Sequence, residues 1–229
     1  MKLLILVPAY NEEEVLNTVL KGLKKLNFKS IKKEIVLIND GSTDRTEQIA
    51  KKNKVTILSH PINRGLGGAL GTGLQYARNM NADIVVTFDA DGQHSHKDII
   101  RILKPIIEKK ADFVIGSRLL KNSQMPPDRK FINFVANILN YILWSVWITD
   151  SQSGLRALSK NAIGKIQIKM NKMEVASEFF KEIKKNNLKV KEIPIKAIYT
   201  NYSRGKGQKN TNAINILVKL LLYRIAGQK

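Results

Sequence analysis

The sequence predicts an α/β fold in which a mostly parallel sheet is flanked by helices. Two observations indicate this: short uninterrupted apolar runs, typical of strands buried on both faces, and intervening segments with apolar residues at helical spacing. A third observation is composition. Of the 229 residues, 43% are hydrophobic and 25% are charged, which suits one packed domain.

The expected strands alternate with expected helices along the first half of the chain. Strands are predicted at residues 3–7, 34–38, 55–58, 84–88 and 113–115. Helical spacing is clear in residues 15–26 and again in residues 99–107. The run at 3–7 is too short for the core of a signal peptide, and acidic residues follow it at once. We therefore expect it to open the sheet, with the chain on the cytoplasmic side.

Two further segments have the pattern of amphipathic helices. Residues 131–149 contain no charged side chain, but Asn133, Asn137 and Asn140 form a polar stripe at helical spacing. We expect a helix that lies in a membrane interface or packs on the domain, rather than one that crosses the membrane. Residues 214–225 repeat apolar side chains at helical spacing, and this helix is expected either to dock on the domain or to contact the membrane.

The charge balance favours an anionic partner. The chain has 39 Lys and Arg against 19 Asp and Glu, a formal net charge of +20, with the excess densest in the last third. Nucleic acid, a phosphorylated small molecule and an acidic membrane surface all fit this charge, and so does a plain compositional bias. The sequence contains no cysteine, which excludes disulfides, thiolate metal sites and cysteine nucleophiles.

Polar and acidic residues follow three of the expected strands, at the end where each strand leaves the sheet. They lie at residues 8–12, 39–42 and 89–93. Because ligands bind at the carboxyl ends of parallel strands, these residues are expected to form one site. Asp89, Asp91 and Gln93 offer the hard oxygen ligands that suit Mg²⁺ or Mn²⁺.

A glycine-rich segment at residues 65–71 has two explanations. It lacks the spacing of the dinucleotide-binding fingerprint, because Leu70 stands where that pattern needs glycine. The glycines either let a helix N-terminus approach a phosphate or allow close packing. Residues 40–44 and 150–154 each fit an ordinary turn or helix cap when taken alone.

Six motifs occur in a fixed order along the chain. They are PAYNE at 8–12, DGSTD at 40–44, NRGLGGA at 63–69, DADGQH at 89–94, GSR at 116–118 and DSQSGLRA at 150–157. As a set, they make residues 3–205 resemble a family 2 glycosyltransferase of the GT-A fold. Within that family the sequence is most similar to polyprenyl-phosphate or dolichyl-phosphate mannosyl- and glucosyltransferases. The resemblance implies a GT-A domain at residues 1–205, including an interface helix at 130–149, and a basic loop and amphipathic helix at 206–229.

The resemblance also implies roles for individual residues. The nucleotide sugar would be bound by Pro8, Tyr10, Glu12, Asp40, Gly68, Asp89, Ala90, Asp91, Arg204 and Lys206. The cation would be held by Asp89, Asp91 and Gln93, and the lipid phosphate by Arg118, Arg129 and Asn133. The catalytic residues would be Asp91, Arg118 and Asp150. Asp150 stands where family 2 enzymes often place a base, and Asn133 replaces a serine common in the related enzymes.

The implied reaction is inverting transfer of a hexose from a UDP- or GDP-sugar to a polyprenyl or dolichyl phosphate, with Mg²⁺ or Mn²⁺. Many related enzymes continue into transmembrane helices, whereas this sequence ends at Lys229. A peripheral enzyme at the cytoplasmic face of the membrane, held by amphipathic helices and charge, is therefore expected. The sequence leaves the sugar, the base, the choice of metal and the oligomeric state open.

Three other functions fit parts of the sequence. A family 2 glycosyltransferase acting on a glycan hydroxyl would share the motifs, but the basic C-terminal part and the paired amphipathic helices count against it. A sugar-nucleotide pyrophosphorylase would share the sheet and an Asp-bound Mg²⁺, but its Gly-rich N-terminal loop is absent. A nucleic-acid-binding protein would explain the net charge of +20, yet no recognised binding motif is present.

Overall fold

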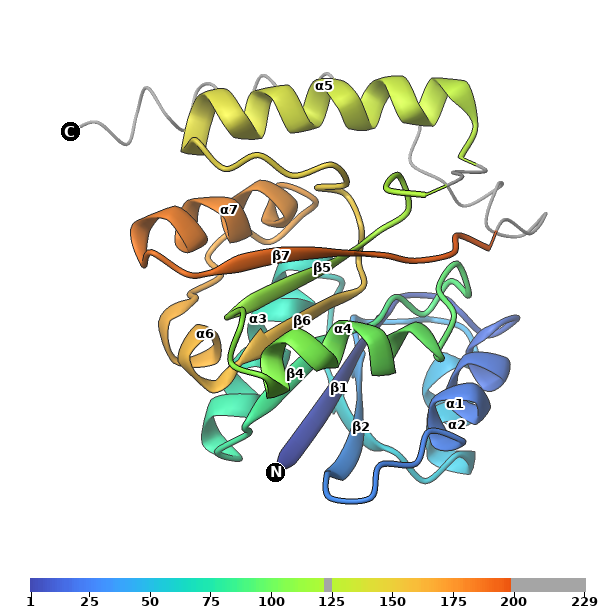
Figure 1. The fold of residues 1–229 in the computed structure, drawn as a ribbon. Coiled ribbons are helices and arrows are strands. Elements are labelled where there is room, and N and C mark those ends of the chain that lie inside the picture. Colours follow the sequence, from blue (N-terminus) through green and yellow to red (C-terminus); the bar gives the residue numbers. More distant parts are fainter. Residues whose placement is uncertain (122–124, 199–229) are drawn as a thin grey trace.

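The computed structural model describes residues 1–121 and 125–198, and its centre is a seven-stranded sheet (Figure 1). The strands are β1 (Lys2–Ala9), β2 (Lys32–Asn39), β3 (Thr56–Ser59), β4 (Ile84–Thr87), β5 (Phe113–Ser117), β6 (Arg156–Ser159) and β7 (Val190–Pro194). Their order across the sheet is β3-β2-β1-β4-β6-β5-β7. All neighbours are parallel except β6, which is antiparallel to both β4 and β5. The prediction of a mostly parallel sheet is confirmed, and the five predicted strands are present.

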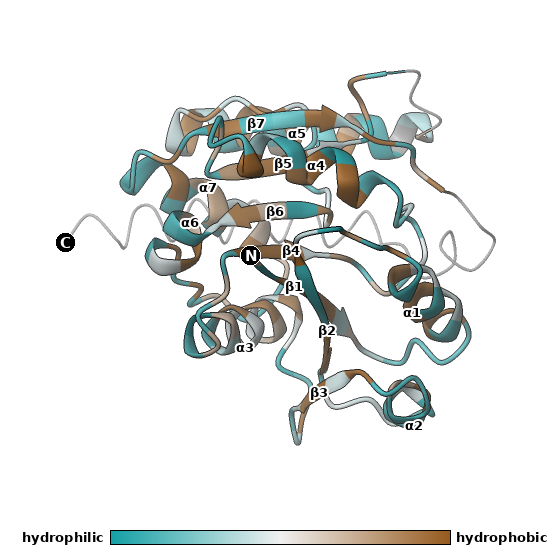
Figure 2. Cartoon of the chain, turned by 60° about the horizontal axis from the view of Figure 1, so that its bottom comes forward, coloured by the Kyte–Doolittle hydropathy of each residue, from teal (hydrophilic) through white to brown (hydrophobic). Residues whose placement is uncertain are grey.

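Helices cover both faces of the sheet. They are α1 (Leu16–Lys24), α2 (Thr46–Lys52), α3 (Leu66–Asn79), α4 (Asp98–Ile107), α5 (Pro127–Trp144), α6 (Lys160–Lys165) and α7 (Val175–Lys185). One core cluster joins the sheet to α1, α2 and α4, and a second joins it to α3, α6 and α7. Figure 2 shows brown and teal alternating along α1 and α4, as expected for helices with one buried face.

The central position of β1 determines where a ligand can bind. Residues 3–9 are all buried, because β1 pairs with β2 on one side and with β4 on the other. The three strands run in the same direction, so the residues that follow Ala9, Asn39 and Thr87 emerge at one edge of the sheet. This is the edge at which the polar motifs were predicted to meet.

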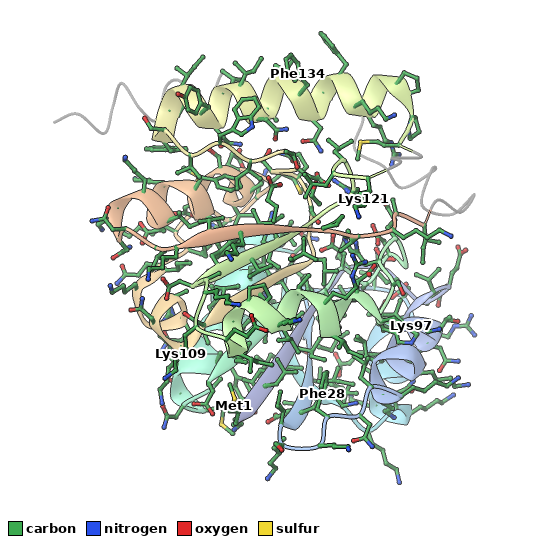
Figure 3. All side chains as sticks on the ribbon, viewed as in Figure 1. Met1, Phe28, Lys97, Lys109, Lys121 and Phe134 are labelled. Atoms are coloured by element: carbon green, nitrogen blue, oxygen red, sulfur yellow. The ribbon has the colours of Figure 1, made fainter. Side chains whose placement is uncertain are left out.

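Helix α5 packs on the domain through its polar side. Asn133, Asn137 and Asn140 are each less than 5% exposed, whereas Phe131 is 68% and Phe134 is 53% exposed. Figure 3 shows the labelled Phe134 pointing away from the rest of the domain. The asparagine stripe therefore faces inward and the apolar stripe faces outward.

The bounds of α5 differ from the predicted 130–149. The helix starts at Pro127, a favourable first-turn residue, and ends at Trp144, where Ser145 takes a left-handed conformation with φ 54°. Across the part of the chain that the structure describes, no helix combines the length and the apolar character needed to cross a membrane. The predicted basic loop and helix at 206–229, with Arg204 and Lys206, lie outside the described residues.

Candidate active site

A pocket of about 410 Å³ opens where β1, β2 and β4 end. Seven residues predicted to bind the nucleotide sugar line it: Pro8, Tyr10, Glu12, Asp40, Asp89, Ala90 and Asp91. Its other lining residues include Asn63, Gly65, Leu66, Ala69 and Met173, which were not predicted as ligand contacts. Predicted residues from three separate motifs thus lie around one cavity.

Asp40 is buried in the pocket wall and holds the neighbouring loop by hydrogen bonds. Its Oδ1 accepts the backbone N–H of Arg64 at 3.0 Å, and its Oδ2 accepts that of Gly65 at 2.7 Å. His60 Nδ1 lies 2.6 Å from Oδ1, and the other ring nitrogen of His60 lies 2.9 Å from Thr72 Oγ1. Asp40 therefore fixes the loop that leads into α3, in addition to facing the pocket.

The glycines at the start of α3 pack against a neighbouring loop. A side chain at Gly67 would collide with the carbonyl of Met170, and the Gly68 N–H donates to the carbonyl of Asn171 at 3.0 Å. The structure therefore supports the packing explanation at these two positions. Gly68, predicted to bind the nucleotide sugar, is not among the pocket-lining residues, and Gly65 takes that place.

A buried carboxylate holds that neighbouring loop. Glu178 of α7 is 5% exposed, and its two oxygens accept the backbone N–H groups of Lys169 at 2.9 Å and Met170 at 3.0 Å. The loop continues to Met173, which lines the pocket. Glu178 thus shapes one wall of the cavity through the loop that it holds.

The carboxylate of Asp89 lies against Gly154 and His94. A Cβ at Gly154 would collide with the Asp89 carboxylate, and the Gly154 carbonyl accepts the Thr87 hydroxyl at 2.7 Å. His94 Nε2 lies 3.6 Å from Asp89 Oδ2. Burial works to raise the pKa of Asp89, but His94 and the positive charges of Arg156 and Arg118 outweigh it and hold the pKa below its usual value.

Asp91 differs electrostatically from Asp89. Burial and the neighbouring Asp89 carboxylate raise the pKa of Asp91 to about 6. The Gln93 backbone N–H donates to Asp91 Oδ1 at 2.9 Å, so this residue contacts Asp91 through its main chain. Two carboxylates that disfavour each other's ionisation are suited to sharing a positive ligand.

The two carboxylates fit a divalent cation that also binds a phosphate. Among residues 1–121 and 125–198, no group of three or more His, Cys, Asp or Glu side chains is arranged to hold a metal ion by itself. Mg²⁺ and Mn²⁺ are commonly bound by one or two carboxylates, with water and phosphate oxygens completing the shell. Asp89 and Asp91 meet this requirement, because both line the pocket. Gly154 leaves the space that the Asp89 carboxylate occupies.

Arg118, Asp150 and Asn133 form a second polar group. Arg118 Nε and Nη2 lie 2.7 and 2.8 Å from Asp150 Oδ2 and Oδ1, and Asn133 Nδ2 donates to Oδ1 at 2.6 Å. Asp150 is fully buried. Both of its oxygens are occupied, so the geometry favours a positioning role over the base expected from the resemblance. Arg129, the third predicted phosphate ligand, lies in the first turn of α5, four residues before Asn133.

Several residues of the site were not predicted from the sequence. His60 was outside every recognised motif, and Gly154 was part of one but was assigned no role; their contacts with Asp40 and Asp89 join residues 20 and 65 positions apart. His94 was part of a recognised motif but was assigned no role. It is 5% exposed, and its Nδ1 has no hydrogen-bond partner among the described residues.

Solved structures with the same fold are glycosyltransferases of the GT-A type. Glucosyl-3-phosphoglycerate synthase from Mycobacterium tuberculosis, in complex with Mn²⁺ and UDP-glucose, matches with a TM-score of 0.72 at 18% identity, over 97% of this chain and 78% of that chain. The same protein with Mg²⁺ and UDP matches with a TM-score of 0.70 at 17% identity, over 97% and 79% of the two chains. At this identity the likeness establishes the fold.

The chain belongs to the glycosyl transferase family 2, whose family model matches residues 4–167. A UDP-N-acetylglucosamine–dolichyl-phosphate N-acetylglucosaminyltransferase of Methanococcus voltae is 36% identical over 96% of this chain and 95% of the relative. An uncharacterised protein of Methanocaldococcus jannaschii is 44% identical over 98% and 93% of the two chains. A dolichol-phosphate mannosyltransferase of Pyrococcus furiosus is 28% identical, over 98% of this chain and 64% of the relative. The predicted family is confirmed, and with it a glycosyltransferase.

Proposed function

We propose that this glycosyltransferase moves a sugar from a nucleoside-diphosphate donor to a polyprenyl or dolichyl phosphate, with inversion at the anomeric carbon. The observation that carries the proposal is the likeness, over nearly the full length of both chains, to a transferase named for a dolichyl-phosphate acceptor. The same relative makes UDP-N-acetylglucosamine the first donor to test. The pocket supports this reaction because it places Tyr10, Asp40 and the Asp89–Asp91 pair around one cavity.

The proposed chemical step is a single displacement. An oxygen of the lipid phosphate attacks the anomeric carbon, the bond from that carbon to the donor's β-phosphate oxygen breaks, and the nucleoside diphosphate leaves with the electron pair. A phosphate monoester has a second pKa of about 6, so at neutral pH the acceptor is largely a dianion. No proton has to be removed from it. The engaged oxygens of Asp150 are compatible with a reaction that needs no base.

The residues that would hold the divalent cation are Asp89 and Asp91, with Gln93 as the predicted third ligand. Mg²⁺ or Mn²⁺ bound there would neutralise the negative charge that develops on the departing diphosphate. The chain's own contribution is to keep the Asp89 carboxylate ionised and fixed against Gly154. Donor binding and the ionisation of Asp91 are therefore expected to depend on each other.

Arg118 would receive the acceptor phosphate. A guanidinium is well suited to bind phosphate oxygens, and Arg118 is already held in one direction by both oxygens of Asp150. Its side chain is 12% exposed, so part of it reaches solvent. In this proposal Arg129, Arg204 and Lys206 add positive charge around the acceptor and the diphosphate.

The outward face of α5 would bring the enzyme to its lipid at the cytoplasmic face of the membrane, as a peripheral protein. Phe131, Phe134 and Ile142 are between 53% and 68% exposed on one helix. Tyr141 and Trp147, which are also half exposed, stack edge to face with ring centroids 5.8 Å apart. Aromatic and aliphatic side chains on one face, with a net charge of +20, suit contact with an anionic lipid surface.

The test is transfer of labelled sugars from UDP- and GDP-donors to polyprenyl phosphate, with Mg²⁺ or Mn²⁺, measured as label in the organic phase. Label from UDP-N-acetylglucosamine or one other donor, lost with EDTA and in Asp91→Asn, is the expected result. Asp91→Asn with full metal-dependent turnover would refute the metal assignment. Donor binding without transfer to lipid, together with transfer to a glycan, would support the alternative of a glycan-hydroxyl acceptor.

A further inference from the structure

Arg156 is a buried charged residue to which the proposed function assigns no contact with substrate or cation. It is 3% exposed and opens β6, the strand that lies between β4 and β5. In the antiparallel register it stands opposite Thr87 of β4 and opposite Ile115 of β5. Asp89 follows Thr87 by two positions, and Arg118 follows Ile115 by three. Arg156 therefore lies between the strand that leads to the cation pair and the strand that leads to the Arg118–Asp150 pair.

The guanidinium of Arg156 has few direct partners for so buried a group. Its Nη2 donates to the carbonyl of Ser151 at 3.4 Å, and its Cζ lies 4.8 Å from the centre of the Phe179 ring. Its Nε has no hydrogen-bond partner, and no carboxylate among the described residues forms a direct ion pair with it. The negative charges that act on it from nearby are Asp89 and Asp150.

Burial lowers the pKa of Arg156 to about 10, which leaves the side chain positively charged at neutral pH. A buried positive charge is tolerated only where neighbouring negative charge compensates for it. Here that compensation comes from two carboxylates, Asp89 in the segment after β4 and Asp150 in the segment before β6, rather than from one close partner.

We propose that Arg156 is a positioning residue shared by both halves of the site, whose buried positive charge holds the carboxylates of Asp89 and Asp150 in place together. The inference rests on the proposed function, because it assigns Asp89 to the donor and cation and assigns Asp150, through Arg118, to the acceptor phosphate. Loss of a residue that served one half of the site alone would weaken binding of one substrate. Loss of Arg156 is expected to weaken binding of both the donor with its cation and the acceptor phosphate.

The experiment compares Arg156→Met and Arg156→Lys with Arg78→Met. Arg78 is the control, because it is a half-buried arginine that likewise donates to backbone carbonyls. Its partners are the carbonyls of Ile163 and Ile166, at 3.1 and 2.7 Å, at the far end of α3. The measurements are Mn²⁺ affinity in the presence of UDP, followed by electron paramagnetic resonance, and KM against kcat for polyprenyl phosphate.

Arg156→Met is expected to weaken Mn²⁺ binding by about tenfold or more, the usual effect of losing a group that orients a metal ligand. It is also expected to raise KM for the lipid phosphate. Arg156→Lys, which keeps the positive charge, is expected to keep Mn²⁺ affinity and KM closer to the native values than Arg156→Met does. Arg78→Met is expected to change neither quantity. A folded Arg156→Met with Mn²⁺ affinity within about twofold of the native value, or with only one substrate affected, overturns the proposal. If Arg156→Met does not fold, Mn²⁺ affinity and KM are compared between Arg156→Lys, which keeps the charge, and Arg156→Gln, which removes it. Equal values in these two variants overturn the proposal.

A double-mutant cycle separates this inference from the proposed function. The unfolding free energies of Arg156→Met, Asp150→Asn and the double variant are expected to be non-additive, because the two buried charges attract each other electrostatically. Lack of lipid transfer by the native protein would reject the proposed acceptor, yet the Mn²⁺ titration and the cycle would still test Arg156. Additive effects, together with unchanged Mn²⁺ binding, would reject its positioning role whatever the acceptor is.

Discussion

Arg118 and Asp150 form a two-point ion pair inside the domain. Nε lies 2.7 Å from Oδ2 and Nη2 lies 2.8 Å from Oδ1, and the Arg118 backbone N–H also donates to Oδ2 at 2.9 Å. Asn133, from the inner side of α5, contributes a further hydrogen bond to Oδ1. Three segments that are distant in the sequence thus meet at one buried carboxylate, which sets the direction of the guanidinium.

Asp150→Asn is expected to lower the free energy of unfolding by about 3 kcal/mol, because it leaves a largely buried guanidinium without its counter-charge. Urea unfolding at neutral pH measures this. Transfer is expected to fall mainly through a higher KM for the lipid phosphate. Asp112→Asn is the control, because Asp112 accepts hydrogen bonds from Ser159 and Asn161 away from the pocket. A large fall in kcat at unchanged stability and KM would instead identify Asp150 as a base.

Stability is also expected to depend on pH through Asp150. Burial alone would raise the pKa of this carboxyl, but Arg118 and Asn133 outweigh burial and hold the pKa below its ordinary value. In the unfolded chain the group titrates near pH 3.9, so the unfolded state takes up the proton first as pH falls, at about this value. The stabilisation is present above about pH 4 and is lost as pH falls through the folded pKa.

The measurement is the difference in unfolding free energy between the native protein and Asp150→Asn. It is expected to stay constant from about pH 7 to about pH 5 and to shrink below about pH 4. A difference that already changes near neutral pH would show that the pKa of Asp150 is not lowered.

Gly154→Ala is expected to disrupt the cation pair, because the new Cβ would collide with the Asp89 carboxylate. We expect Mn²⁺ affinity in the presence of UDP to fall by about tenfold or more, with Asp89 displaced. Gly164→Ala is the matched control, since nothing lies within 4 Å of a Cβ at that position in α6. That substitution should leave Mn²⁺ binding unchanged and stabilise the helix by about 0.5–1 kcal/mol. Native-like Mn²⁺ binding by Gly154→Ala would contradict the close contact.

Replacing Phe131, Phe134 and Ile142 with serine is expected to release the protein from anionic vesicles. Each of these side chains would bury apolar surface worth about 1.5–3 kcal/mol if fully inserted, so the triple variant should bind at least about tenfold more weakly. Vesicle flotation measures this. Thermal unfolding in water should change little, because all three side chains are exposed.

The matched control for the vesicle experiment is Ile100→Ser. Ile100 is 53% exposed on α4, a helix that packs on the sheet in the same core cluster as α1 and α2. Ile100→Ser should leave vesicle binding unchanged. Equal vesicle binding by the native protein and the triple variant would show that α5 is not the docking face.

The sequence predicted the parts of the fold that local pattern determines. The apolar runs at β1, β2 and β4 are strong because these strands are buried on both faces, and the polar residues after each run predicted the edge where the pocket lies. Strands β6 and β7 were missed. β6 is four residues long and begins with a charged arginine. In β7 the adjacent Lys191 and Glu192 interrupt the apolar run.

The site could be predicted only as far as single motifs reach. Asp89 and Asp91 are recognisable from their position after a strand, and the structure places both on the pocket wall. The contact of Gly154 with Asp89 joins residues 65 positions apart, and that of Asp40 with His60 depends on the path of a loop. Such contacts are created by tertiary packing, which leaves no periodic pattern in the chain.

The inward asparagines of α5 have a consequence for the proposed function, in which the protein works at a lipid surface. A helix attached by apolar contacts alone would lose the hydrophobic driving force for packing on its domain once hydrocarbon surrounded it. Asn137 instead donates to the Thr149 carbonyl at 2.7 Å and accepts from the Ser151 N–H at 3.1 Å. Asn140 accepts the Ser177 hydroxyl at 2.6 Å. Hydrogen bonds of this kind strengthen as the surroundings become less polar, so adhesion of α5 should tighten at the bilayer, where water-driven adhesion fades.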